Sequence, residues 1–347
     1  MQPIYTAELL TNKIKKDYAG DIAIVVIYGS TIYNDTHSRS DLDLFFVPKT
    51  ERGYRLGFTF IIDGIGFDFW PISWERLDRI ANHDERITSI ITDGKVIYCS
   101  SDSDRDRFNE IKKKALDKSD QNKFLYKASA KLNELYKDLY RLHKATTLSD
   151  IHKVTISMIY GISDVLALLN HTPIKRGRGK LKEEIMNMPL VPQQFSELYD
   201  TAFFSRDINV IKQAYAELFE NTRTLFIEEH AKSAELHSFI EILSGFYEEL
   251  ISAYNKIYHA CEIEDPVTAL FASAELTNAI EQAFGDTGVS SADLLDLVAA
   301  YDPDNLSELC RAAHEHQNIF EKILKTNGVT LREFKDFNDL EAFLASL

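Results

Sequence analysis

Cysteine and long apolar segments are both scarce in this sequence of 347 residues. Its three cysteines lie far apart, without Cys-x-x-Cys spacing, which argues against a disulfide framework and a cysteine zinc site. No apolar run approaches the roughly 20 residues that span a bilayer. The first residues lack the basic start and apolar core of a signal peptide. We therefore expect a cytoplasmic protein with no membrane partner.

Basic residues are also in the minority. The sequence has 39 lysines and arginines against 54 aspartates and glutamates, a formal net charge of −15. Tight nonspecific binding to a polyanion draws on clustered cations, so nucleic acid is not an expected ligand. The charge would suit a cationic substrate. An acidic surface that only maintains solubility explains the balance equally well.

The spacing of apolar residues predicts two kinds of structure in sequence. Short apolar runs alternate with amphipathic segments up to residue 102, and helical spacing broken by proline and glycine follows. This pattern predicts an α+β fold, with an N-terminal mixed β-sheet and flanking helices followed by all-α bundles. The expected domains are 1–102, 103–230 and 231–347. The elements expected in the first are helices at 5–18 and 73–82, strands at 22–28, 42–47, 55–62, 67–72 and 95–99, and a four-residue hairpin turn at 63–66.

Three aspartates stand out in the predicted sheet. Asp41 and Asp43 are two residues apart, so a strand would point both carboxylates to one face and Leu42 to the other. Such a pair repels unless divalent cations neutralise it, and hard oxygen ligands suit Mg²⁺. Asp68 lies between aromatic residues, where a buried ionised carboxylate would need a compensating charge. If its strand pairs beside that of Asp43, the three can hold two metal ions. Alternatively, Asp41 caps a turn and the other two face solvent.

Gly29 and Ser30 directly follow the first predicted strand. A turn without a Cβ that opens a helix lets backbone N–H groups approach phosphate oxygens, and the serine adds a hydroxyl donor. We interpret the pair as a phosphate-binding turn.

The string Gly29-Ser30, ten residues and Asp41-Leu42-Asp43 resembles the signature of the DNA polymerase β-type nucleotidyltransferase superfamily, with Asp68 on its third-carboxylate strand. Within it, the chain looks most like the kanamycin (aminoglycoside 4′) nucleotidyltransferases over roughly residues 5–230, and residues 231–347 have no counterpart. The resemblance implies transfer of a nucleotide, expected to be AMP, from an NTP to a hydroxyl of an aminoglycoside-like small molecule, with release of pyrophosphate. It further implies Mg²⁺ at Asp41 and Asp43, expected as two ions, phosphates at Gly29 and Ser30, Asp68 near the attacking hydroxyl, and a homodimer.

The same resemblance places a general base on the first long helix of the second domain. In the segment 131–144, Glu134, Asp138 and Arg141 share one helix face, and either carboxylate is a candidate base. Arg141 is a candidate nucleotide ligand. The spacing is also ordinary for a solvated face with ion pairs.

Two further features support other functions. The basic loop, residues 175–180, has four cations in six residues and could reach a triphosphate or a nucleic acid, although we favour a solvated loop. Arg311 and His316 have the R-x4-H spacing of HEPN ribonucleases, which we interpret as chance on a helix surface. These two features are the only support for the alternative function, a toxin–antitoxin-type nucleotidyltransferase that modifies a protein or tRNA. A degenerate nucleotide-binding regulator is the third hypothesis, against which the three carboxylates count.

Overall fold

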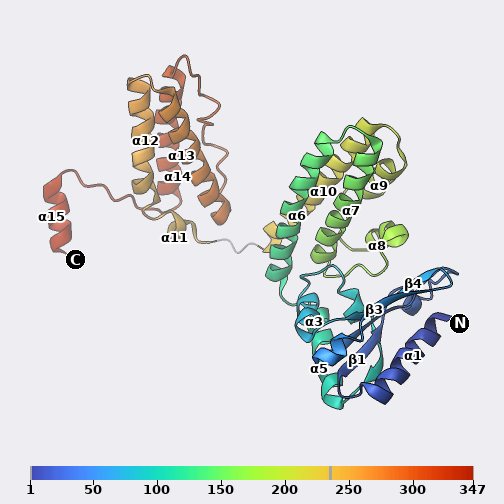
Figure 1. Cartoon of the computed structure of the whole chain (residues 1–347). Coiled ribbons are helices and arrows are strands. Elements are labelled where there is room, and N and C mark those ends of the chain that lie inside the picture. Colours follow the sequence, from blue (N-terminus) through green and yellow to red (C-terminus); the bar gives the residue numbers. More distant parts are fainter. Residues whose placement is uncertain (1, 234–236, 347) are drawn as a thin grey trace. The chain divides into compact units, whose positions relative to one another are not determined.

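The computed structural model describes residues 2–233 and 237–346. Contacts divide the chain into two compact units, Met1–Ser233 and Ala234–Leu347, and each is described by itself (Figure 1). The first unit begins with a sheet and ends in long helices. In the described part of the second, helices joined by loops are the regular elements.

The sheet of the first unit has five strands in the order β3-β4-β2-β1-β5. β1 is antiparallel to β2 and β5, β4 is parallel to β2, and β3 is antiparallel to β4. The sheet is therefore mixed, and the predicted α+β fold class is confirmed. Its strands are β1 (Ile22–Ile27), β2 (Asp43–Pro48), β3 (Phe58–Ile62), β4 (Ile65–Pro71) and β5 (Lys95–Cys99).

β1 is buried along its whole length, because helices cover both faces of the sheet. Helix α1 (Gln2–Asp17) covers one face of the sheet, with Leu10 and Ile14 in the same core as Val25. Helices α3 (Trp74–Ala81), α4 (Ser89–Thr92) and α5 (Asp102–Leu116) cover the other face, where Phe108 packs with Val26. A strand buried on both faces has the continuously apolar sequence seen here. The predicted strand at 22–28 is thus confirmed to within one residue.

The hairpin differs from the prediction. Its turn has two residues, because β3 ends at Ile62 and β4 begins at Ile65. Asp63 and Gly64 have φ of 51° and 77°, the left-handed conformation of a tight hairpin turn, for which Asp-Gly is a preferred pair. The four-residue turn expected at 63–66 is wrong. The first strand of the hairpin, β3, begins at Phe58 and not at residue 55 as expected. A short helix, α2 (Glu51–Tyr54), which Thr50 caps, precedes it.

The helical part of the first unit has its own core. Helix α7 (Leu148–Leu169) is central to it and is long and apolar enough to cross a membrane by length and composition alone. More than half of it is buried against its neighbours, as expected of a core helix. The other helices are α6 (Gln121–Lys144), the 3₁₀ turn η2 (Arg178–Lys180), α8 (Leu181–Met186), α9 (Phe195–Phe204) and α10 (Ile208–Ser233).

The division of this unit into domains at residue 102 stays a prediction. Helix α5 begins at that residue and packs on the sheet through Phe108 and Ile111, so the core of the sheet extends beyond the expected boundary.

The second unit is built around a separate apolar core. A buried polar pair lies inside it, where the Tyr254 hydroxyl and His316 Nδ1 are 2.7 Å apart. Its helices are α11 (Phe239–Leu243), α12 (Phe246–Glu262), α13 (Pro266–Thr287), α14 (Ser307–Thr326) and α15 (Phe337–Ala345).

Candidate active site

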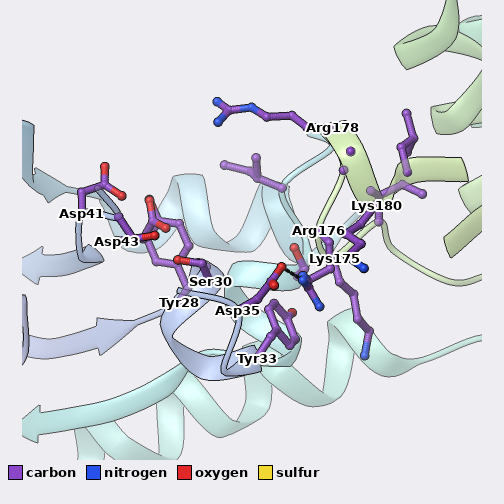
Figure 2. Close-up of a pocket in the computed structure, with 18 of the residues that line it drawn as sticks. Tyr28, Ser30, Tyr33, Asp35, Asp41, Asp43, Lys175, Arg176, Arg178 and Lys180 are labelled. Atoms are coloured by element: carbon purple, nitrogen blue, oxygen red, sulfur yellow. Dashed lines mark ion pairs between the residues drawn. The ribbon is translucent and has the colours of Figure 1, made fainter. Parts of the chain in front are cut away.

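A pocket of about 1060 Å³ lies within the first unit, between the sheet domain and the segment that follows α7. A cavity of this size holds a drug-sized ligand with space to spare. One wall carries the phosphate-binding turn and the carboxylates, and the opposite wall carries the basic loop (Figure 2). Its polar lining includes Tyr28, Ser30, Tyr33, Asp35, His37, Arg39, Ser40, Asp41, Asp43, Arg86, Ser89, Tyr160, Ser163, Lys175, Arg176, Arg178 and Lys180.

Gly29 and Ser30 open a 3₁₀ helix, η1 (Gly29–Tyr33), directly after β1. Gly29 has φ of 72°, and a Cβ added there would lie 1.9 Å from Oδ2 of Asp43. Only glycine allows this close approach, because the backbone conformation and the contact both exclude a side chain. The Ser30 backbone N–H donates to the Asp43 carboxylate. The turn therefore lies directly against the carboxylate site.

Asp41 and Asp43 lie on the same side of the chain at the entrance to β2, with Leu42 and Leu44 buried on the other side. Burial and the charge of Asp41 raise the pKa of Asp43 to about 6, which Arg178 and the Ser30 N–H partly offset. The geometry agrees with the pairing that the period of two predicts.

Asp68 lies beside this pair, because β2 and β4 place Asp43 and Asp68 in register. Burial raises the pKa of the Tyr28 phenol, and the charges of Asp43, Asp68 and Asp41 raise it further, so all three carboxylates are near enough to act on this group. Asp68 itself is exposed, whereas Phe67 and Phe69 are buried on the opposite face. The expected burial of Asp68 among aromatic residues is therefore wrong: the strand alternates, and the carboxylate is on its open side.

Whether this site fits Mg²⁺ depends on how many carboxylate ligands the ion needs from the protein. Among the described residues, no three His, Cys, Asp or Glu side chains are already close enough to enclose a metal ion. Mg²⁺ is commonly held by one or two carboxylates together with substrate phosphates rather than by a complete protein cage. Asp41 and Asp43 supply two such oxygen donors at the pocket, so the residues present fit an ion that binds together with a nucleotide.

The basic loop lines the pocket and is anchored there, although Lys175, Arg178, Gly179 and Lys180 are exposed, as the predicted solvated loop requires. Glu184 of α8 accepts hydrogen bonds from three successive backbone N–H groups of the loop, those of Lys175, Arg176 and Gly177. Figure 2 shows Arg178 extending from the loop toward the end of the pocket that holds Asp41 and Asp43. Sequence spacing does not reveal this, because the loop lies far along the chain from the residues it faces.

Three acidic residues near the pocket were missed in the sequence. Asp35 forms an ion pair with Arg176. Asp93 accepts a hydrogen bond of 2.7 Å from the Tyr33 hydroxyl and pairs with Lys175 at 2.9 Å. Glu184 holds the loop backbone. None belongs to a local motif, and only an alignment of relatives could have suggested that they act together.

The three predicted residues of α6 lie outside the lining of this pocket. Glu134 pairs with Lys131 at 3.2 Å, and Arg141 pairs with Asp138 at 2.7 Å. Asp138 also accepts a hydrogen bond of 2.5 Å from the Ser157 hydroxyl. The structure thus shows these side chains as ion-paired groups on a helix, and their catalytic and nucleotide-binding roles stay predictions.

The R-x4-H pair is also separated in the structure. His316 is only 2% exposed and bonds to Tyr254, whereas Arg311 is exposed and pairs with Glu308 and Glu315. A ribonuclease centre needs both side chains at one accessible site. The interpretation as chance holds for Arg311, but His316 is a core residue and not a surface one.

The charge of the pocket bears on its ligands. Its lining holds six lysines and arginines against three aspartates. This is not the acidic cleft that would attract a polycationic acceptor, and it suits a ligand with phosphate groups.

The helical part of the first unit matches a known protein family. Residues 105–232 match the family model of the KNTase C-terminal domain. Among solved structures, the chain is similar to a nucleotidyltransferase-like protein from Exiguobacterium sibiricum 255-15, with 12% identity and a TM-score of 0.39, over 66% of this chain and 79% of that one. No curated protein matches the chain. Residues 105–232 therefore resemble the C-terminal domain of kanamycin nucleotidyltransferases, and the helices α11 to α15 lie beyond the matched segment.

Proposed function

We propose that this protein transfers a nucleotide, AMP in the first instance, from an NTP to a hydroxyl group of a small molecule and releases pyrophosphate. One observation carries the proposal: a glycine-serine turn, two paired carboxylates and a cationic loop line the same pocket. Each of these features suits one part of a Mg²⁺-bound triphosphate. The family match of the second half of this unit supports the same chemistry.

The roles of the residues follow from their positions. The Gly29 backbone N–H and the Ser30 hydroxyl bind phosphate oxygens at the end of β1, while the Ser30 N–H holds the Asp43 carboxylate. Asp41 and Asp43 hold the magnesium, which when bound neutralises the charge that builds up on the phosphates during transfer. The close contact between Gly29 and Asp43 keeps the two functions in a fixed relation.

Asp68 is our first candidate for the residue that acts on the acceptor, although it lies outside the residues that line the pocket. It lies next to Asp43 in the sheet, yet it is exposed on the open side of β4. There its carboxylate can accept the proton of the attacking hydroxyl, provided that this group is within hydrogen-bond reach. Glu134 and Asp138 are the other proposed bases. Separate E134Q and D138N variants with undiminished turnover would remove them.

The acceptor is a hydroxylated small molecule. The resemblance to kanamycin nucleotidyltransferases suggests an aminoglycoside. The cationic lining of the pocket also favours neutral acceptors. Both belong in the test.

The experiment incubates the purified protein with Mg²⁺, each labelled NTP and a panel of aminoglycosides and neutral polyols. We expect pyrophosphate release that depends on one acceptor class and on Mg²⁺. D43N should lower turnover by roughly 100-fold or more, because it removes a metal ligand. D106N, which changes an exposed aspartate of α5, is the matched control and should behave as wild type.

Two outcomes would contradict the proposal. Transfer of label to a protein or to tRNA, with none to small molecules, would support the toxin-type function instead. Nucleotide binding without turnover under any condition would make the protein a regulator.

A further inference from the structure

The basic loop is held in one conformation by a single carboxylate. Glu184 accepts the N–H groups of Lys175, Arg176 and Gly177 at 2.7, 2.6 and 3.0 Å. A carboxylate with three charge-assisted hydrogen bonds is a strong anchor for a backbone segment. Immediately after it, Gly177 and Arg178 have φ of 57° and 44°. Two consecutive residues with positive φ turn the chain sharply, directly next to the segment that Glu184 holds.

The first two cations of the loop are engaged with the sheet domain. Lys175 pairs with Asp93, which is also bound by the Tyr33 hydroxyl, and Arg176 pairs with Asp35. The Arg176 guanidinium also lies 5.5 Å from the centre of the Tyr33 ring. These contacts fasten the loop across the pocket from two sides, and they use the charges of both residues.

Arg178 is left for a ligand. Within the described residues it has no ion pair, although it lines the pocket and its charge acts on Asp43. Figure 2 shows its guanidinium directed toward the carboxylate end of the pocket. Lys180, the remaining cation, pairs with the exposed Glu183 at 3.2 Å. The loop thus presents one unpaired guanidinium where the proposed phosphates would lie.

We propose that Arg178 binds the terminal phosphates of the NTP and that Glu184 is a positioning residue that presents it. This inference rests on the proposed function and deepens it. A planar guanidinium with five donors can bind two phosphate oxygens at once, which favours arginine at such a position over a mobile lysine. Because Glu184 and the ion pairs of Lys175 and Arg176 hold the loop, little further ordering is needed when the nucleotide binds.

The test measures binding without turnover, with Mg²⁺ and a non-transferable ATP analogue in which a methylene group replaces the oxygen between the α- and β-phosphates. We expect R178Q to weaken this binding about 10- to 100-fold and to leave AMP binding unchanged, since AMP lacks the terminal phosphates. K182Q is the matched control, because Lys182 pairs with Asp200 outside the pocket lining. It should bind the analogue as wild type does.

A second set of variants tests the positioning role. E184Q offers one acceptor oxygen in place of a carboxylate, so the KM for the NTP should rise while kcat changes less, and E184D should recover part of the loss. Thermal unfolding of each variant shows whether the fold is intact.

The outcomes are separable from those of the proposed function. Wild-type binding of the analogue without turnover would overturn the transferase proposal and leave this inference standing. Unchanged affinity in R178Q, an equal loss for AMP, or a wild-type protein that binds no NTP would overturn the inference itself. If kcat and the affinity for the NTP fell by the same factor in both E184Q and E184D, Glu184 would have only a structural role.

Discussion

Gly29 is the residue on which the geometry of the site depends most directly. Its φ of 72° and the 1.9 Å approach of a hypothetical Cβ to Asp43 Oδ2 are two separate barriers to any side chain. Gly64 at the hairpin has a similar φ of 77°, but nothing lies within 4 Å of a Cβ added there. Comparing substitutions at the two glycines therefore distinguishes the effect of backbone strain from the effect of the contact with the Asp43 carboxylate.

We predict that G29A and G64A both lose about 1–3 kcal/mol of unfolding free energy, because alanine is strained at positive φ. Only G29A should also lose Mg²⁺-dependent NTP binding, since its methyl group displaces Asp43. Denaturant unfolding and nucleotide titration measure the two effects. Normal binding by G29A would show that the turn tolerates a shift of Asp43 and would contradict our account.

The candidate site was predictable where its residues are close in sequence. Gly29, Ser30, Asp41 and Asp43 fall within 15 residues of each other, and strand periodicity alone orients the two aspartates. Asp35, Asp93 and Glu184 gave no signal, because their partners come from distant segments. Asp68 was recognised by its neighbours but assigned the wrong environment, since apolar flanking residues do not say which face of a strand is covered.

Among the elements, α12 and α14 show a packing feature that depends on pH. His316 and Tyr254 are joined in the core between them, and burial lowers the pKa of His316 to about 4. The unfolded chain has an ordinary histidine, with a pKa near 6.5. Below that value the unfolded state takes up a proton that the folded state does not, so stability is full above about pH 6.5 and falls toward pH 4.

We predict that the second unit loses up to about 3 kcal/mol between pH 6.5 and pH 4 on account of this group. H316Q should flatten the pH dependence, because glutamine can bond to Tyr254 but does not titrate. H259Q, which changes an exposed histidine of α12, is the control. Hydrogen exchange of the α14 amides measures the local free energy. An equally steep loss in H316Q would locate the acid sensitivity elsewhere.

The whole chain consists of two units with separate apolar cores. The pocket, its carboxylates and the loop that faces them all belong to the first unit. A part with its own core can in principle fold alone.

We predict that a fragment of residues 1–233 folds and binds Mg²⁺ with the ATP analogue within about threefold of the full chain, because no described residue of the other unit lines the pocket. Circular dichroism and calorimetric titration test both statements. A folded fragment that has lost binding would show that residues 234–347 complete the site.

The sequence by itself determined the α+β class, β1 and β5, and the motif from Gly29 to Asp43, because each follows from local periodicity and from residues that neighbour each other along the chain. The tertiary structure alone decided that β4 lies parallel to β2, that Asp68 is open to solvent, and that the basic loop faces the carboxylates. Those features depend on contacts between distant segments, which local propensity does not encode. The same applies to His316, whose burial is decided by the helices packed around it.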